Sequence, residues 1–218
     1  MKIKIIEDGY STAVARMFNV RKSFGFHPIN DDNIKPDLIV FTGGPDISPE
    51  IYGQTKLPGV HVNIERDKKE LAIYQKYKDL PKVGICRGGQ LLNVLCGGNL
   101  WQDINKHYND HEVINLLSTG KYEAGESIFM TSSHHQMMIP GPGAEVIAIA
   151  QNASGDKGIA TVHKSSDANL KPTPYDPEVI WYEKEKTLCF QGHPEYLNTR
   201  TSRDSCDYFF NLMNYFYG

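Results

Sequence analysis

Cysteine is scarce in this chain: four of its 218 residues are cysteines, at positions 86, 96, 189 and 206. Their spacing matches neither paired zinc-binding Cys-x-x-Cys motifs nor the dense framework of a small disulfide-stabilised protein. The spacing therefore excludes a zinc-finger-like or disulfide-scaffold protein, and we expect the four thiols to be reduced.

Long apolar runs and clustered positive charge are also missing. No hydrophobic stretch reaches the roughly 20 residues that a membrane-spanning helix needs, and the first residues do not read as a signal peptide. The formal net charge is −3, and interspersed charges leave no basic stripe for nucleic acid. We therefore expect a cytoplasmic protein that binds neither membranes nor nucleic acid.

The length allows one sizeable core. A chain of 218 residues can build one α/β domain but has little room for a second catalytic domain. No internal repeat or low-complexity tract divides the sequence. We expect a single domain over residues 1–218, without a synthetase domain of its own.

Apolar periodicity predicts strands and helices that alternate in the first half of the chain. The predicted elements are a strand over 1–6, a helix over 11–24, a strand over 38–42, a helix over 66–80, a strand ending at Cys86, short strands over 111–116, 127–132, 144–151 and 157–163, a hairpin over 179–191 and a helix over 202–217. An opening strand, helix and strand indicate a doubly wound α/β sheet.

One cysteine stands between a strand-like apolar run and a glycine-rich helix start, in KVGICRGGQLL at residues 82–92. A residue on a sharp strand-to-helix turn projects its side chain outward, and small neighbours let the backbone fold tightly around it. Backbone N–H groups and the helix dipole favour an anion there, so Cys86 should ionise readily and act as a nucleophile. A buried structural cysteine in a tight turn is the alternative.

A histidine and a carboxylate follow a β-prone run near the C-terminus, in LCFQGHPE at residues 188–195. A cysteine nucleophile needs a base, and the base needs an orienting group. Together with Cys86, the pattern predicts a triad in which His193 moves protons and Glu195 fixes the imidazole tautomer. Taken alone, His-Pro-Glu would be read as a loop after a strand.

Two glycines follow the strand predicted over 38–42, in TGGPD at residues 42–46. Such glycines expose backbone N–H groups, which stabilise the oxyanion that forms when a thiolate attacks an amide. We expect the N–H groups of Gly44 and Arg87 to form this oxyanion hole. Taken alone, Gly-Gly-Pro is an ordinary turn signal.

The histidines elsewhere have simpler interpretations. His107 and His111 are four residues apart, as metal ligands on a helix can be, but the residues between them indicate a loop. No third ligand is obvious, so we expect no metal and no other cofactor. His134 and His135 could compete with His193 as the base, yet no carboxylate follows them at an orienting distance. Substrate binding suits them better.

The ordered motifs Gly-Gly-Pro, Gly-Ile-Cys-Arg-Gly-x-Gln, Ser-Ser-His-His-Gln and His-Pro-Glu resemble those of the class I glutamine amidotransferase superfamily, over about residues 36–200. PDISPEIYG at 45–53, ERD at 65–67 and the Ser-x-His-His-Gln block resemble its γ-glutamyl-hydrolase-like branch. The resemblance implies a flavodoxin-like α/β sandwich, with a central, mostly parallel sheet and the cysteine on a nucleophile elbow.

The resemblance also implies roles for individual residues. The triad is Cys86, His193 and Glu195, the oxyanion hole is Gly44 and Arg87, and the substrate-binding residues are Gly43, Gln90, Ser133, His134, His135 and Gln136. Relatives usually carry bulkier residues at the positions of Gly89 and Gly192. We therefore expect an opened pocket wall on the side of the leaving amine.

Three functions remain open at this point. One is a glutaminase that passes ammonia to a separate synthetase, and another is a hydrolase of a larger γ-glutamyl amide. Both use the same catalytic residues, so the motifs do not separate them. The third is a non-catalytic or redox-sensing protein with an elbow cysteine, against which the intact His193 and Glu195 pair argues.

Overall fold

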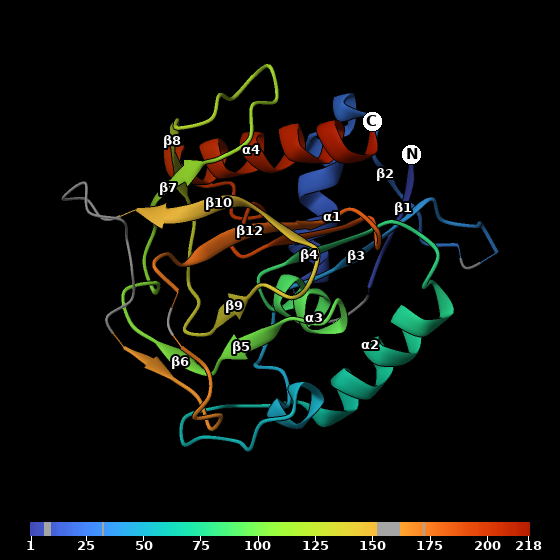
Figure 1. The fold of residues 1–218 in the computed structure, drawn as a ribbon. Coiled ribbons are helices and arrows are strands. Elements are labelled where there is room, and N and C mark those ends of the chain that lie inside the picture. Colours follow the sequence, from blue (N-terminus) through green and yellow to red (C-terminus); the bar gives the residue numbers. More distant parts are fainter. Residues whose placement is uncertain (7–9, 32, 152–161, 172) are drawn as a thin grey trace.

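The computed structural model describes residues 1–6, 10–31, 33–151, 162–171 and 173–218. A nine-stranded sheet runs through the described part of the chain, with helices on both faces (Figure 1). The two termini lie near each other at one end of the molecule (Figure 1). The predicted α/β fold is confirmed.

The helices and strands alternate in the first half, and strands dominate the second. The helices are α1 (Ser11–Val20), α2 (Ile64–Lys76), α3 (Arg87–Leu95) and α4 (Arg200–Tyr217), with short 3-10 helices at Lys22–Phe24 and Pro49–Tyr52. The main-sheet strands are β1 (Lys2–Ile5), β2 (His27–Pro28), β3 (Leu38–Phe41), β4 (Lys82–Ile85), β7 (His111–Asn115), β8 (Ser127–Met130), β10 (Ala144–Gln151), β12 (Pro177–Tyr182) and β13 (Thr187–Phe190). Two small sheets pair β5 (Asn99–Trp101) with β9 (Met137–Ile139), and β6 (Asp103–Ile104) with β11 (His163–Lys164).

The strand order determines where a site can form. The order is β2-β1-β3-β4-β13-β12-β10-β7-β8, in which the first five strands are parallel and the remaining steps antiparallel. The parallel part has the flavodoxin-like order, and ligands bind beyond the carboxyl ends of such strands. β3, β4 and β13 end level with one another, since Phe41 pairs with Gly84 and Phe190 with Ile85. The predicted site segments follow directly after these ends.

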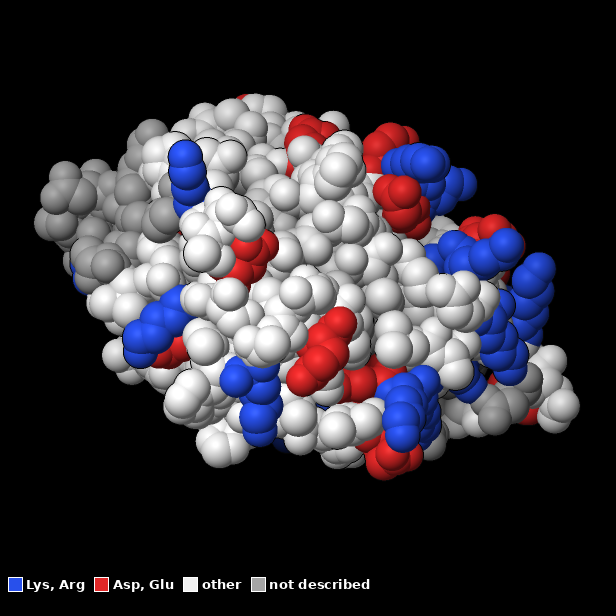
Figure 2. All heavy atoms as spheres, turned by 60° about the horizontal axis from the view of Figure 1, so that its bottom comes forward, with Lys and Arg blue, Asp and Glu red and all other residues white. Residues whose placement is uncertain are grey.

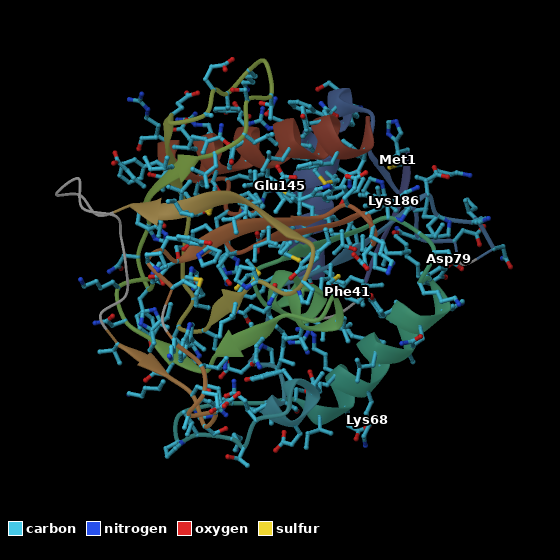
Figure 3. All side chains as sticks on the ribbon, in the orientation of Figure 1. Met1, Phe41, Lys68, Asp79, Glu145 and Lys186 are labelled. Carbon is cyan, nitrogen blue, oxygen red and sulfur yellow. The ribbon has the colours of Figure 1, made fainter. Side chains whose placement is uncertain are left out.

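Each parallel strand sends alternate side chains to two cores. Val40 packs on one face, where α1 and α4 cover the sheet, whereas Ile39 and Phe41 pack on the other, against α2 and α3. Figure 3 shows Phe41 in the interior beside α3, and Lys68 pointing outward from α2. Burial on both faces explains why these strands read as continuous apolar runs.

Helix boundaries differ from the predicted ones for local reasons. α2 begins at Ile64 because the side chain of Asn63 accepts a hydrogen bond from Arg66 N at 3.1 Å. α1 ends at Val20, and the 3-10 helix that follows stops at Gly25, whose φ of 84° suits glycine. The strand predicted over 157–163 falls largely outside the described residues.

The surface agrees with the composition. On the face shown in Figure 2, Lys and Arg side chains alternate with Asp and Glu side chains, without a continuous basic stripe. Among the described residues, no helix combines the length and apolar character needed to cross a bilayer.

Candidate active site

Cys86 occupies a strained turn between β4 and α3. Its φ is 50° and its ψ is −114°, and its N–H donates to the Phe190 carbonyl at 2.7 Å. A Cβ on Gly84 would lie 2.3 Å from the Gly88 carbonyl carbon, and one on Gly88 would lie 2.4 Å from the Phe41 oxygen. Any larger residue at position 84 or 88 would clash with this backbone. Because both residues are glycines, α3 can start directly against β3 and β4. The predicted elbow is therefore present, with Cys86 7% exposed.

His193 and Glu195 form a buried pair beside Cys86. His193 Nδ1 lies 2.8 Å from Glu195 Oε1, and since a carboxylate only accepts, the proton sits on Nδ1. Cys86 is close enough to His193 to shift the pKa of its ring. Burial lowers the pKa of His193, but the charge of Cys86 and the hydrogen bond to Glu195 outweigh it and raise this pKa well above its usual value.

Neighbouring groups hold the His193 ring in one plane. The Tyr196 ring stacks on it at 4.6 Å with an angle of 2°, and Tyr10 contacts it edge-on at 5.7 Å. The backbone N–H of His193 donates to the Thr131 carbonyl oxygen at 2.9 Å, and Thr131 Oγ1 donates to the backbone carbonyl oxygen of His193 at 2.6 Å. Thr131 thus fixes the backbone that carries the ring. These three residues were not identified from the sequence, because they come from other parts of the chain or carry no motif.

A cavity of about 180 Å³ brings most of the predicted site residues together. Its walls are formed by Gly44, Pro45, Asp46, His61, Cys86, Gln90, Ser133, His134, His135 and Gln136. Gly43 lies next to the His193 ring instead, since an added Cβ would be 3.2 Å from its Cε1. The predicted residues that line this cavity come from three separate parts of the chain, namely the turn after β3, the start of α3, and the loop between β8 and β9.

Two polar contacts shape the cavity. Gln90 Nε2 donates to the Gln136 carbonyl at 3.2 Å, which joins α3 to the loop between β8 and β9. Nearer the surface, His135 Nε2 lies 2.9 Å from Asp46 Oδ1, and the hydrogen bond to Asp46 raises the pKa of His135. The other oxygen of Asp46 accepts from His61 N at 2.8 Å. Asp46 and His61 are cavity residues that the motifs did not indicate as such.

The Arg87 side chain anchors the start of α3. Its guanidinium pairs with both Asp67 and Glu70, and all three side chains are buried. Glu70 also accepts from Arg66 Nε at 2.8 Å, and Arg66 Nη2 donates to the Thr42 carbonyl at 3.0 Å. Arg66 and Asp67 of the Glu-Arg-Asp sequence, together with Glu70, thus connect α2 with the two turns that carry Gly44 and Cys86. Removing one partner from such a network typically costs about 3–5 kcal/mol.

Gly44 has no room for a side chain. A Cβ there would lie 2.0 Å from Arg66 Nη1. Its backbone lines the cavity that contains Cys86, and Arg87 is the first residue of α3, where backbone N–H groups lack an acceptor within the helix. Both predicted oxyanion donors therefore belong to turns that border Cys86.

The expectation of an opened wall at Gly89 and Gly192 is wrong. A Cβ on Gly192 would lie 2.5 Å from Met130 Cγ and 2.8 Å from the Thr131 carbonyl oxygen. A Cβ on Gly89 would lie 3.0 Å from Phe190 N. Neither glycine lines the cavity; both permit close packing of backbone beside the elbow and the strand that leads to His193.

Gly192→Ala should therefore destabilise the fold without narrowing the substrate range. We expect a loss of about 1–3 kcal/mol, as for other overpacked sites, measured by thermal or urea unfolding. In the Met130→Ala background the same substitution should cost less, because part of the clash is removed. Unchanged stability together with a selective loss of activity on larger γ-glutamyl amides would restore the open-wall interpretation.

Comparison with known proteins identifies the family. Residues 33–171, more than half of the chain, match the family described as Peptidase C26. The chain belongs to the Peptidase C26 family. This match agrees with the motifs and with the fold, and it supports the assignment of the chain to the class I glutamine amidotransferase superfamily.

Two curated relatives are each 30% identical to this chain over the aligned residues. Protein NtpR of Enterococcus hirae is 30% identical over 162 residues, which cover 66% of this chain and 67% of NtpR. The Lactococcus lactis protein named "Putative glutamine amidotransferase-like protein YvdE" is 30% identical over 164 residues, again 66% of this chain and 67% of the relative.

Solved structures share the fold of this Peptidase C26 chain at lower identity. PurLQS from Thermotoga maritima superposes with a TM-score of 0.61 at 16% identity, over 98% of this chain and 97% of that one. A glutamine amidotransferase from Thermotoga maritima has a TM-score of 0.57 at 13% identity, over 98% and 84%. The class I glutamine amidotransferase fold predicted from the motifs is thus confirmed.

Proposed function

We propose that this chain hydrolyses the γ-amide of glutamine, with Cys86 as nucleophile, His193 as general acid and base, and Glu195 as the group that orients His193. One observation carries the proposal: the elbow thiol borders a cavity, and a hydrogen-bonded histidine–carboxylate pair with a distance of 2.8 Å lies beside it. Nucleophile, base and orienting group in contact form the arrangement that covalent amide hydrolysis requires.

In the first half of the reaction, the Cys86 thiolate attacks the γ-carbonyl carbon and forms a C–S bond. The carbonyl oxygen becomes an oxyanion, and the N–H groups of Gly44 and Arg87 donate to it. Protonated His193 gives its proton to the amide nitrogen, the C–N bond breaks, and ammonia leaves. A γ-glutamyl thioester remains on Cys86.

In the second half, a water molecule attacks the thioester carbon while neutral His193 accepts its proton. The C–S bond breaks, glutamate is released, and the thiolate and imidazolium form again. The raised pKa of His193 supports this cycle, because it favours a proton on the imidazole at the start of each turnover.

The same cavity supports recognition of the glutamyl half. Gln90 and the loop residues Ser133, His134, His135 and Gln136 line it together with Gly44. In this proposal the polar groups of the loop bind the α-amino and α-carboxylate groups of the substrate. Gly43 keeps the backbone close to the His193 ring, where a larger residue would displace it.

A separate synthetase is the proposed receiver of ammonia. One structure with the same fold, from Thermoplasma acidophilum, is described as that of a candidate GMP synthase subunit and aligns over 99% of this chain and 92% of that one, with a TM-score of 0.58. Likeness to a protein described as part of a synthase supports a partner for the present chain.

A second hollow supports the alternative substrate, a larger γ-glutamyl amide. It has a volume of about 220 Å³ and shares His135 with the main cavity; the remaining walls are Pro58, Gly59, Gln102, Asp103 and Tyr108. In this alternative, an amine longer than ammonia extends past His135 into this space, beside Asp103, whose carboxylate pairs with Lys164 at 2.6 Å.

A hydrolysis screen tests both substrates. Purified protein is incubated with glutamine and with γ-glutamyl amides of neutral, cationic and anionic amines, and released glutamate is measured. Release from glutamine supports the glutaminase, and preference for a larger amide supports the alternative. If no substrate is hydrolysed and an electrophilic glutamine analogue fails to label Cys86, the proposed function is wrong and a non-catalytic role is favoured.

A further inference from the structure

A second polar cluster lies behind the wall of the cavity. We define the histidine cluster as His107, His111, His134 and Glu178. His107 lies in the loop before β7, His111 begins β7, His134 lies in the loop between β8 and β9, and Glu178 belongs to β12. The side chains of His107, His134 and Glu178 are at most 2% exposed, and that of His111 is 13% exposed.

The four side chains converge on one point. One ligand-type atom from each residue lies within 4.8 Å of all the others. We call the ring nitrogens that face the centre of the cluster the inward nitrogens, and the others the outward nitrogens. The inward nitrogens His107 Nδ1 and His111 Nε2 are each 3.0 Å from Glu178 Oε1, and His134 Nε2 is 3.3 Å from it. A tetrahedral zinc ion with bonds of about 2.0–2.1 Å separates its ligand atoms by about 3.3 Å. The three distances from Glu178 Oε1, 3.0–3.3 Å, are near this value, while the limit for the whole cluster, 4.8 Å, is wider.

The outward nitrogens specify the protonation of each ring. His111 Nδ1 lies 3.0 Å from the Asn109 carbonyl oxygen, and His134 Nδ1 lies 3.0 Å from the Gln136 carbonyl oxygen. His107 Nε2 lies 3.0 Å from Asp176 Oδ2. Because carbonyls and carboxylates only accept, each outward nitrogen carries a proton. In the neutral rings, the inward nitrogens therefore present lone pairs.

If all three rings are neutral, three lone pairs and a carboxylate oxygen face each other and repel. The inward nitrogens of His107 and His134 and the second oxygen of Glu178 have no hydrogen-bond partner, although all are buried. Without a metal, second protons on His107 and His111 would let both rings donate to Glu178 Oε1, which would bury two imidazolium ions against Glu178 and Asp176 and still leave His134 Nε2 without a partner. A single divalent cation instead balances these two carboxylates and accepts all three lone pairs.

We propose that the histidine cluster is a zinc site, in which His107 Nδ1, His111 Nε2, His134 Nε2 and Glu178 Oε1 are the four ligands. Three imidazoles and one carboxylate form a ligand set that suits zinc. The carbonyl and carboxylate partners of the outward nitrogens are the supports that metal-bound histidines usually have.

The site is closed and therefore structural. All four positions around the ion are filled by protein, which leaves none for water or substrate. The ion would join β7, β12 and two loops, one of which continues from His134 into Gln136 at the cavity wall. Zinc would thus hold the loop that lines the cavity, while Cys86 and His193 lie outside its ligand set.

Metal analysis of purified protein tests the proposal. The chain, produced with zinc in the medium and then dialysed, should contain about one zinc ion per molecule. Removal with a strong chelator should lower the Tm by roughly 5–10 °C, and added zinc should restore it. Cobalt in the emptied site should give the intense visible bands of tetrahedral coordination.

Variants distinguish this site from others. Glu178→Gln and His107→Asn should lose the zinc, and Asp176→Asn, which removes the support of His107, should weaken affinity about 10–100-fold. Cys86→Ala should keep the full zinc content, since a thiolate site at the elbow is the chief competitor. The exposed His27→Asn is the matched control and should also keep it.

The proposal is overturned in two ways. It fails if the wild-type chain, which needs no variant to fold, neither contains zinc nor binds zinc or cobalt after chelation. It also fails if Cys86→Ala loses the metal while Glu178→Gln, folded by circular dichroism, retains it. Both measurements are independent of hydrolysis, so failure of the proposed glutaminase leaves this test intact.

Discussion

Cys86→Ala is expected to reduce hydrolysis of the preferred substrate by about 10⁴- to 10⁶-fold, the loss seen when a covalent nucleophile is removed. The reason is positional: among the four cysteines, Cys86 lines the cavity, and it is the one that raises the pKa of the His193 imidazole. Steady-state assays of glutamate release measure the loss. Circular dichroism and the Tm should remain close to wild type, because Ala at this position keeps the backbone of the elbow.

Cys96→Ala is the matched control. Cys96 caps the other end of α3, is half-buried and lies outside the cavity. We expect the activity of Cys96→Ala to stay within a few-fold of wild type. Cys189→Ser and Cys206→Ser should cause no comparable loss of activity in folded protein. A loss as large as that of Cys86→Ala from any of these variants would transfer the nucleophile to another cysteine.

The fold was predictable because its signals are local. The alternation of apolar residues, the glycines that follow β3 and β4, and the helix-stopping residues all act over short stretches of chain. The parallel strands β3 and β4 are buried on both faces, which gives them the apolar runs seen in the sequence. The strands β12, β10, β7 and β8 of the antiparallel extension were also predicted, but their order in the sheet was not, because it depends on pairing between segments that lie far apart in the chain.

The candidate site was predictable where residues that are close in the sequence are also in contact in the structure. Cys86 is held by Gly84 and Gly88, which lie beside it in the sequence, and His193 precedes its partner Glu195 by two residues. Tyr10 contacts the same imidazole edge-on and Thr131 Oγ1 donates to the backbone carbonyl of His193, but both residues come from distant segments. Nothing in their immediate sequence indicates this role, since the contact exists only after the sheet has formed.

Gly192 shows how a correct motif can mislead. A glycine where relatives carry a bulky residue suggests extra space, but space is determined by neighbours as well as by the residue itself. Here Met130 and the Thr131 carbonyl occupy the volume. The sequence records only what is missing at position 192, whereas the structure shows what replaces it.

The histidine cluster shows the reverse case, in which the sequence did not reveal residues that the fold brings together. His107 and His111 were visible as a pair, but their third and fourth partners, His134 and Glu178, lie 23 and 67 residues beyond His111 in the chain. Only the pairing of β12 with β10, and of β10 with β7, brings Glu178 to the histidines. The expectation that the chain binds no metal rested on the missing third ligand, and the proposed zinc site replaces it.

His193→Asn should be nearly as damaging as the loss of Cys86, with a fall in kcat/KM of about 10⁵- to 10⁶-fold, whereas Glu195→Gln should be about ten- to a hundredfold milder. Asn cannot accept or return the proton that each half of the reaction transfers. Gln at position 195 still contacts His193 Nδ1 but no longer supplies the negative charge that stabilises the imidazolium. Kinetics of both variants on the preferred substrate measure the order.

Alkylation of Cys86 separates the catalytic effect from misfolding. Because the pKa of His193 is raised, the proposed mechanism places an imidazolium beside the Cys86 sulfur, and a neighbouring positive charge favours attack by sulfur on an electrophile. Iodoacetamide labelling at pH 7 should therefore slow strongly in His193→Asn, less in Glu195→Gln, and not at all in the exposed control His27→Asn, while raising the pH should restore it in both triad variants. If Glu195→Gln were the slower enzyme, or if labelling at pH 7 were unchanged in folded His193→Asn, the roles of base and orienting carboxylate would have to be reassigned.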